Sequence, residues 1–419
     1  MGSTVAVETL GCRLNQAESE SMARELAEAG YCLASASDGA DIYILNTCTV
    51  THVADRKSRH LLRLARRRNP EALIIAIGCY PQRAPDELAQ MEGVDIVLGN
   101  GEKARILDII EDRGMIDREP PNNTAPTLRT RSMVKIQEGC NQFCSYCIVP
   151  FVRGREHSEP IEEVVNEAKE RISVGYQEVT LTGTQIGAYK PSLEMLVRRI
   201  LAETDIGRLR LSSLRPQDLT PQLIALWDDD RLCPHLHLSL QSGSDSVLTR
   251  MLRQYSAADY QKAVARVREA VPDVAITTDI MVGFPGETDE EFEQSHRFCQ
   301  MMGFANIHVF SYSERPGILA AEMPQKVAEK VKSVRSKKML ELSKEMASRY
   351  RERFLGRSMT VLWEREVERG VWVGLTENYI RVFASSNEPL KNKFTPAKLV
   401  GWHNNDLWAV PLFSPVNMS

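Results

Sequence analysis

The sequence contains no run of eighteen apolar residues, which excludes a membrane-spanning helix. Its first residues, MGSTVAVETLGC, lack the basic and apolar regions of a secretory signal, so nothing points to an oxidising compartment. The net charge is small, at −4, and by itself favours neither a nucleic acid nor any other partner. With 43% hydrophobic and 26% charged residues, the 419-residue chain is typical of a soluble protein of two or three domains. We expect a cytoplasmic protein with no membrane partner.

A fourth cysteine is missing from the segment EGCNQFCSYC, where Cys140, Cys144 and Cys147 have the spacing C-x3-C-x2-C. Nine cysteines in a reducing compartment indicate metal-binding or catalytic thiols, because disulfides are rare there. A structural zinc site and an ordinary iron–sulfur cluster each take four protein ligands. Three thiolates would leave one iron of a cluster open to bind a small molecule. A zinc site completed by His157 is the less favoured alternative.

The middle of the chain alternates short β-rich runs with amphipathic helical ones. Six such units predict parallel strands with right-handed crossovers, in an open partial (β/α)6 barrel. The expected strands are residues 133–137, 177–183, 208–214, 235–241, 274–284 and 305–313. In such folds the site lies on loops after the carboxyl ends of the strands, and the three cysteines directly follow the first strand.

A smaller α/β pattern precedes it, with strands expected at 4–10, 41–47 and 72–78 and helices at 16–29 and 54–68. Each strand is followed by a cysteine, in order Cys12, Cys48 and Cys79. Because the carboxyl ends of parallel strands share one edge of the sheet, these thiols should converge into a second triplet.

The last part of the chain changes to period-two patterns after a long helix expected at 324–355. Strands expected at 359–367, 370–376, 379–384 and 398–412 predict a small β-barrel of roughly 60 residues. The predicted domains are therefore residues 1–117, 132–355 and 356–419. The proline- and asparagine-rich residues 118–131 are the predicted linker.

These motifs resemble a known family. A C-x3-C-x2-C loop on a partial βα barrel is similar to the radical S-adenosylmethionine (SAM) superfamily. With TLGCRLNQAESE, NTCTVTHVADRKSR, GCYPQ and a barrel similar to a TRAM domain, nearly the whole chain resembles the methylthiotransferases. The resemblance implies two 4Fe-4S clusters, one held by Cys140, Cys144 and Cys147 that binds SAM, and an auxiliary one held by Cys12, Cys48 and Cys79. Cys32, Cys233 and Cys299 are expected to be small apolar residues without a role.

The strand ends of the central domain should complete the SAM pocket. After the second strand, TLTGTQIGAY resembles the family segment that reaches the SAM amino group. The fourth and fifth strands are followed by similar polar or glycine-containing turns, the latter spanning Phe284 to Glu287, and the backbone of Tyr146 is expected beside adenine. The candidate SAM residues are Tyr146, Gly183, Thr184, Gln185, Ser239, Gln241 and Gly283. After the sixth strand, Ser311 and Ile318 replace a proline and a threonine of the family pattern, so no SAM contact is predicted there.

The cysteine contexts are most similar to the branch that adds a methylthio group to C2 of N6-threonylcarbamoyladenosine, next to the anticodon of tRNA. Branches acting on isopentenyladenosine in tRNA or on a ribosomal-protein aspartate are alternatives, and a non-catalytic iron–sulfur RNA-binding protein is an alternative of another class. The resemblance implies that a 5′-deoxyadenosyl radical removes hydrogen from C2, that the auxiliary cluster delivers sulfur, and that a second SAM supplies the methyl group. It also implies an electron donor such as flavodoxin or ferredoxin and a sulfur source. The sequence predicts no side chain that acts as acid or base.

Two predicted helices are strongly basic. Residues 54–68 carry seven Lys or Arg against one Asp, a local charge of +6, and residues 324–357 carry eleven against four Glu, a charge of +7. Such surfaces predict contact with a phosphate backbone. The candidates for RNA binding are Lys337, Lys338, Arg63 and Arg66. The alternative is a solvated face above an apolar stripe.

Overall fold

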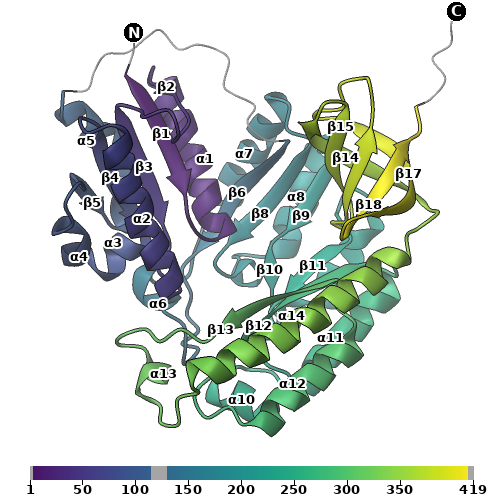
Figure 1. Ribbon diagram of the computed structural model, residues 1–419. Coiled ribbons are helices and arrows are strands. Elements are labelled where there is room, and N and C mark those ends of the chain that lie inside the picture. Colours follow the sequence, from purple (N-terminus) through teal and green to yellow (C-terminus); the bar gives the residue numbers. More distant parts are fainter. Residues whose placement is uncertain (1–2, 115–129, 414–419) are drawn as a thin grey trace, which may run out of the picture.

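A computed structural model describes residues 3–114 and 130–413, and Figure 1 shows an N-terminal α/β domain, a half-open barrel and a small closed barrel. The N-terminal domain is a parallel sheet in the order β2-β1-β3-β4-β5. Its central strands β3 (Ile42–Thr47) and β4 (Leu73–Gly78) are buried along their whole length, which explains the apolar runs at residues 42–45 and 73–77. The other elements are β1 (Thr4–Thr9), β2 (Cys32–Leu33), β5 (Ile96–Leu98), α1 (Arg13–Glu28), α2 (His52–Arg68), α3 (Cys79–Arg83), α4 (Pro85–Ala89), η1 (Asn100–Arg105) and α5 (Ile106–Asp112).

The central domain is the predicted partial barrel. Its strands form two sheets, β7-β6-β8-β9 and β10-β11-β12-β13, and all pairs are parallel except that of the short β7 with β6. The sheets separate at Ser212, so the strand predicted at 208–214 is divided in two. The strands are β6 (Arg131–Glu138), β7 (His157–Ser158), β8 (Glu178–Gly183), β9 (Arg208–Leu211), β10 (Ser213–Leu214), β11 (His235–Leu238), β12 (Ala275–Val282) and β13 (Asn306–Ser311).

Helices cover the outer face of this half-barrel and form its main core with it. They include α7 (Ile161–Ser173), α8 (Leu193–Glu203), α11 (Ala257–Ala270), α12 (Asp289–Met302) and α14 (Glu329–Glu352), with α14 along the edge strand β13. Leu236 and Leu238 of β11 point into this core. Because side chains alternate along a strand, His235 and His237 face the interior of the half-barrel.

The C-terminal domain is a closed five-stranded barrel in the order β14-β15-β16-β18-β17, as the sequence predicted. Its core contains the fully buried Trp363. The strands are β14 (Ser358–Glu368), β15 (Val371–Thr376), β16 (Arg381–Ser385), β17 (Phe394–His403) and β18 (Asp406–Pro411). The single strand predicted at 398–412 is thus a hairpin, whose turn includes Asn404 in the left-handed region at φ 55°.

One tyrosine of this barrel, Tyr379, lies against the amino ends of the half-barrel strands β6 and β11. The Tyr379 ring stacks on His235, with centroids 4.7 Å apart, and its hydroxyl accepts a hydrogen bond from Arg131 at 3.1 Å. Burial would raise the pKa of Tyr379, but Arg131 and Arg13 outweigh it and hold the pKa below its usual range. Arg131 begins β6, and residues 118–129 of the predicted linker lie outside the described residues.

Other boundaries differ from prediction by a few residues. α1 begins at Arg13 and not at residue 16, and α14 spans a shorter range than 324–355. The two-residue β2 and three-residue β5 were missed, because so few residues show no alternation. Within residues 3–114 and 130–413, no helix has the length and apolar character needed to cross a membrane.

Candidate metal centres and cofactor site

The first cysteine triplet lies on the loop after β6, as predicted. Gly139 turns the chain there with φ 72°, and a Cβ at this position would lie 1.9 Å from the Arg155 carbonyl oxygen, so only glycine fits. The Cys140 amide then donates to the Gly154 carbonyl at 3.1 Å, and the Cys147 amide to the Cys144 carbonyl at 2.9 Å. These bonds fold the three thiols into one compact loop at the carboxyl end of the first strand.

Polar side chains from neighbouring strand ends surround these thiols. The Gln185 side-chain amide lies 3.2 Å from Cys140 Sγ, and with its oxygen toward Arg215 it accepts from that guanidinium at 2.6 and 2.8 Å. Its NH2 group then faces the sulfur. On the other side, Arg253 donates to Cys144 Sγ at 3.4 Å. Donors directed at ligand sulfurs stabilise the negative charge of a thiolate-bound cluster.

The second triplet forms at one edge of the N-terminal sheet. Strand register pairs Thr9 with Asn46 and Thr47 with Gly78, so the loops after β1, β3 and β4 start side by side. Gly11, at φ 121°, lets the first loop approach closely, because a Cβ there would lie 2.7 Å from that of Cys48. Cys12, Cys48 and Cys79 influence one another electrostatically. The sheet therefore brings together three thiols that are far apart in sequence.

Burial disfavours the thiolate forms of Cys48 and Cys147 when no metal is bound. Burial raises the pKa of Cys48, in the second triplet, to about 12, and it raises the pKa of Cys147, in the first triplet, to about 12. A cluster must therefore displace the protons as it binds, which couples loading to pH. No cysteine is in a disulfide. The described residues contain no group of His, Cys, Asp or Glu that could hold a single ion, whereas in a 4Fe-4S cluster each cysteine binds a different iron.

Asn15 fastens the loops of the second triplet. Its side chain is 1% exposed, and its NH2 donates to the carbonyls of Leu10 and Thr47, both at 2.9 Å. Its oxygen accepts from Arg153 at 2.6 Å and faces Cys12 Sγ at 3.4 Å. One amide thus ties together the loops that carry Cys12 and Cys48.

Arg153 joins the N-terminal domain to the half-barrel. It follows the short helix α6 (Val149–Val152), after the first triplet, and its side chain is 3% exposed. It pairs with Glu18 of α1 at 2.7 Å and with Glu138 of β6 at 2.6 Å. Burial would raise the pKa of Glu18, but Arg153 and Lys103 outweigh it and lower the pKa to about 2. This carboxylate is therefore ionised at neutral pH.

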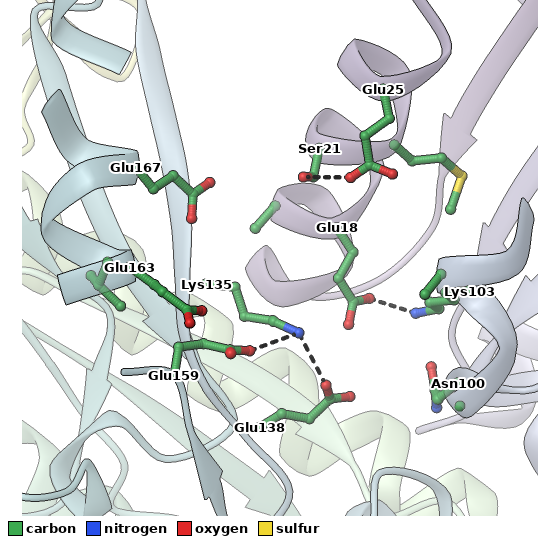
Figure 2. A pocket seen from close by; sticks show the side chains of 15 residues that line it. Glu18, Ser21, Glu25, Asn100, Lys103, Lys135, Glu138, Glu159, Glu163 and Glu167 are labelled. Carbon is green, nitrogen blue, oxygen red and sulfur yellow. Dashed lines mark hydrogen bonds and ion pairs between the residues drawn. The ribbon is translucent and has the colours of Figure 1, made fainter. Parts of the chain in front are cut away.

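A cavity of about 350 Å³ lies beside this junction. Figure 2 shows α1 and η1 on one side and β6 and α7 on the other, with Lys103 and Lys135 among the glutamates. Lys135 pairs with Glu138 at 3.4 Å and with Glu159 at 3.1 Å. Its charged lining is Glu18, Glu25, Lys103, Lys135, Glu138, Glu159, Glu163 and Glu167. The cavity borders the contact between the two domains.

The two triplets approach each other across that contact. Cys79 of the second packs with Ile148 and Val152, which follow the first, and with Ile318. Asn100 donates to the Val152 carbonyl at 2.7 Å and lies 3.6 Å from Cys79 Sγ. The Ile318 loop, for which the sequence predicted no SAM contact, instead contacts the N-terminal domain.

A buried ion pair makes the same connection. Arg315, in the loop after β13, pairs with Asp55 of α2 at 2.6 Å, and both side chains are almost fully buried. Arg83 also reaches Asp55, at 3.2 Å. Sequence reasoning missed Arg153, Arg253 and Arg315. The only local signal was an arginine close to each cysteine or glycine motif, which does not identify its partner.

The predicted SAM residues lie at the strand ends around the first triplet. The Thr184 hydroxyl is buried without a partner among the described residues, which fits a ligand that supplies one. Gln241 is held at φ 72° by hydrogen bonds to Asp279 and from Met281, and the Ser239 carbonyl accepts from the Tyr255 hydroxyl at 2.6 Å.

Tyr146 and Gly183 have more structural surroundings. The Tyr146 side chain packs against an apolar cluster that includes Phe284, which leaves its backbone role a prediction. A Cβ on Gly183 would lie 2.6 Å from the Gln137 carbonyl oxygen. Gly283, at φ 72°, donates to Glu287 at 2.6 Å, and Lys332 of α14 covers it. Arg335 of α14 pairs with Glu287 at 2.6 Å, so α14 supports this turn.

The RNA candidates divide into free and paired cations. Arg63 and Lys337 are exposed without an ion pair among the described residues, whereas Lys338 pairs with Glu293. Arg66 binds the carbonyls of Pro70 and Ala72 and pairs with Asp95 at 2.6 Å. On α14 and its flanks, carboxylates of other elements pair with Lys326, Arg335, Lys338, Arg351, Arg353 and Arg357. The charge of +7 counted along the sequence is thus largely neutralised in the fold.

Comparison with known proteins covers almost all of these elements. Residues 4–99 match the model described as uncharacterized protein family UPF0004, and residues 134–299 match that of the radical SAM superfamily. The chain is 36% identical over 423 residues to the threonylcarbamoyladenosine tRNA methylthiotransferase of Bacillus subtilis. The aligned region covers 95% of this chain and 94% of that protein. It is 39% identical over 394 residues to the Thermotoga maritima protein of the same name, covering 90% of each.

A solved structure shares the fold. A radical SAM methyltransferase from Kitasatospora setae superposes with a TM-score of 0.56, covers 77% of each chain and is 16% identical.

Replacing Asn15 by leucine should loosen the second triplet. The change removes the side-chain donor to the Leu10 and Thr47 carbonyls and one partner of the Arg153 guanidinium, and we expect a loss of about 1–3 kcal/mol in the free energy of unfolding. Anaerobic urea unfolding would measure it, and hydrogen exchange should become faster in residues 9–12 and 47–49. Gln16→Leu on the same helix is the matched control, because no hydrogen bond of the Gln16 side chain is found among the described residues. Equal effects of the two changes would contradict the role of Asn15.

Proposed function

The chain belongs to the radical SAM methylthiotransferase family, and we propose that it adds a methylthio group to C2 of N6-threonylcarbamoyladenosine next to the anticodon of tRNA. The observation that carries this proposal is the meeting of two three-cysteine loops from different domains. Each supplies three thiols, which suits a cluster with one iron left open. A substrate between them would face both.

Each triplet suits one 4Fe-4S cluster, and the first suits SAM as well. Cys140, Cys144 and Cys147 would hold the SAM cluster, and Cys12, Cys48 and Cys79 the auxiliary one. When bound, these groups would supply the one-electron cleavage of SAM and the sulfur of the methylthio group. The protein orients and isolates them, and no side-chain acid or base is assigned.

Two guanidinium groups, the buried one of Arg153 and the half-buried one of Arg253, prepare the two sites for negative charge. Arg253 lies against Cys144 of the SAM loop, and Arg153 lies beside Cys12 and Cys79. A cluster with three thiolates carries negative charge, so a fixed guanidinium nearby stabilises it without solvent. Gln185 adds a donor at Cys140. The apolar contact of Cys79 with Ile148 and Val152 keeps water from the space between the loops.

Helix α2 is the better candidate surface for the tRNA backbone. Four of its cations, Arg56, Lys57, Arg63 and Arg67, are exposed without an ion pair among the described residues. On α14, most basic side chains are paired with carboxylates. Unpaired exposed cations release counterions when they meet phosphates, so they contribute most to RNA affinity.

Further parts of the proposal follow from the family. The chemistry needs an electron donor such as flavodoxin or ferredoxin, and a sulfur source to refill the auxiliary cluster. We place the protein in the cytoplasm, where its free thiols and tRNA substrate would coexist. The proposed domains remain residues 1–117, 132–355 and 356–419, with the SAM pocket formed in the second.

Nucleoside mass spectrometry tests the proposal directly. Deleting the gene from its host should remove 2-methylthio-N6-threonylcarbamoyladenosine from tRNA and leave the unmethylthiolated nucleoside in its place. Restoring the gene should restore the product. Loss of the methylthio derivative of isopentenyladenosine, or of a ribosomal-protein modification, would assign the protein to another branch. Unchanged tRNA would favour a non-catalytic RNA-binding protein.

Cysteine variants test the division between the two clusters. Anaerobically reconstituted protein should contain about eight irons, four for each cluster. Changing Cys12, Cys48 and Cys79 together to alanine should leave about half, and this variant should still form 5′-deoxyadenosine from SAM under strong reductant but no methylthio product. Changing Cys140, Cys144 and Cys147 should abolish both. Wild-type protein that never exceeds one cluster would contradict the auxiliary site.

Salt dependence tests the role of α2. Arg63→Gln with Arg67→Gln should weaken tRNA binding. The negative slope of log K against log salt should become shallower by roughly 1.4 to 1.8, since each phosphate contact contributes roughly 0.7 to 0.9. The matched comparison is Lys337→Gln with Lys344→Gln on α14, which makes the same change in net charge. A larger effect of the α14 pair would restore that helix as the RNA surface.

A further inference from the structure

Three arginines converge on Tyr379 at the base of the half-barrel, and only two of them have a carboxylate partner. The guanidinium carbons of Arg13, Arg131 and Arg210 lie 5.7, 5.6 and 4.7 Å from the centre of the ring. Arg131 pairs with Glu364 at 2.7 Å, and Arg210 pairs with the fully buried Glu178 at 2.8 Å. Within the described residues, no carboxylate lies within ion-pair distance of Arg13.

The position of Arg13 is costly for a cation without a counterion. Its side chain is partly buried, and its one polar contact among the described residues is a 3.5 Å hydrogen bond to the Tyr379 hydroxyl. A guanidinium has five N–H donors, so most of them lack a protein acceptor. Arg13 is also the first residue of α1, where the helix dipole disfavours positive charge. A cation placed against these terms points to a ligand that supplies the missing anion.

Arg13 lies between the second triplet and Tyr379 of the C-terminal barrel. It directly follows Cys12 of the second triplet. Burial lowers the pKa of His235 of β11 and of His308 of β13, and the positive charge of Arg13 adds to this effect at both imidazoles. Ile307 of the edge strand β13 packs into the main core on the outer face of the sheet. Because side chains alternate along a strand, His308 and Phe310 lie on the opposite face, toward the interior. Phe310 is 47% exposed. The Phe310 ring and the His308 imidazole therefore face the interior of the half-barrel, and Arg13 reaches Tyr379 from the start of α1, next to the second triplet.

We propose that Arg13 binds the carboxylate of the threonylcarbamoyl group and thereby selects the charged nucleoside over those with an apolar N6 substituent. This inference rests on the proposed function. In adenine, N1 alone separates the reacting C2 from C6, so the N6 substituent lies on the same side of the ring as C2. When C2 faces the loop of Cys12, the substituent comes to the neighbouring residue, Arg13.

The selectivity follows from the cost of an unpaired charge. A carboxylate supplies the acceptors that Arg13 lacks, and such a charge-assisted pair is about twice as strong as a neutral hydrogen bond. An isopentenyl group would desolvate the guanidinium and leave it unpaired. Sites that pair a buried polar group with the correct substrate reject analogues that lack the partner.

The test compares RNA substrates that differ only in charge at the carboxylate. Anticodon stem-loops carrying N6-threonylcarbamoyladenosine, its methyl ester, or isopentenyladenosine are given to reconstituted wild-type protein, Arg13→Gln and Arg13→Lys. We expect wild-type protein to prefer the acid to the ester by at least about tenfold in kcat/KM, the effect of one charge-assisted hydrogen bond. Arg13→Gln should lose this preference, and Arg13→Lys should keep part of it.

Controls separate recognition from folding. Arg24→Gln removes another arginine of α1, one that contacts Ser21 and Glu167, and should keep the wild-type preference. Iron content and thermal unfolding show whether each variant is intact. If Arg13→Gln does not fold, the acid and ester comparison in wild-type protein still decides.

Three outcomes would overturn the inference. Equal wild-type rates on acid and ester would show that the carboxylate is not read. An equal loss on acid and ester in Arg13→Gln would mean that Arg13 contacts a phosphate or positions Cys12. In both of these cases activity on threonylcarbamoyladenosine itself would leave the proposed function standing. Wild-type activity on isopentenyladenosine alone would overturn both.

Discussion

The guanidinium of Arg153 holds together the two domains that build the site. It reaches from the loop behind the first cysteine triplet to Glu18 and Asn15 of α1, and it also pairs with Glu138 at the end of β6. The group is almost fully buried, so its three partners replace water completely. Without it, Glu18 would keep only Lys103, and Glu138 only Lys135, as a cationic partner among the described residues, and the loops of the two triplets would lose their common support.

The parallel strands impose the same arrangement on both domains. In each sheet the cysteines follow the carboxyl ends of strands, where short loops converge. The half-barrel lacks the strands that would close it, and α1 of the N-terminal domain lies against β6 and β8 at its open side (Figure 1). The C-terminal barrel contributes Tyr379, which lies at the amino ends of the half-barrel strands, opposite to the cysteine loops. Three domains therefore surround one interior that carries aromatic, imidazole and guanidinium groups.

Charge is distributed by pairing across elements and not by the composition of single helices. α14 is strongly basic in sequence, yet Arg335 holds the turn after β12 and Arg351 pairs with Asp406. α2 has a similar excess, but Arg63 and Arg67 meet no carboxylate among the described residues. Arg13 is unpaired in the same sense inside the molecule. Cations without partners therefore mark the surfaces and sites available to an anionic substrate.

The sequence by itself determined the local features. The C-x3-C-x2-C spacing, the strand before each of Cys12, Cys48 and Cys79, and the period-two pattern of the last domain each lie within a few neighbouring residues, so the six parallel strands and the closed barrel could be predicted. The tertiary structure alone decided which charges meet. Arg153 with Glu18, Arg315 with Asp55 and Arg131 with Glu364 are more than a hundred residues apart, and no local pattern encodes such partners. It also decided that Arg13 has none among residues 3–114 and 130–413, because a missing partner becomes visible only when the neighbours in space are compared.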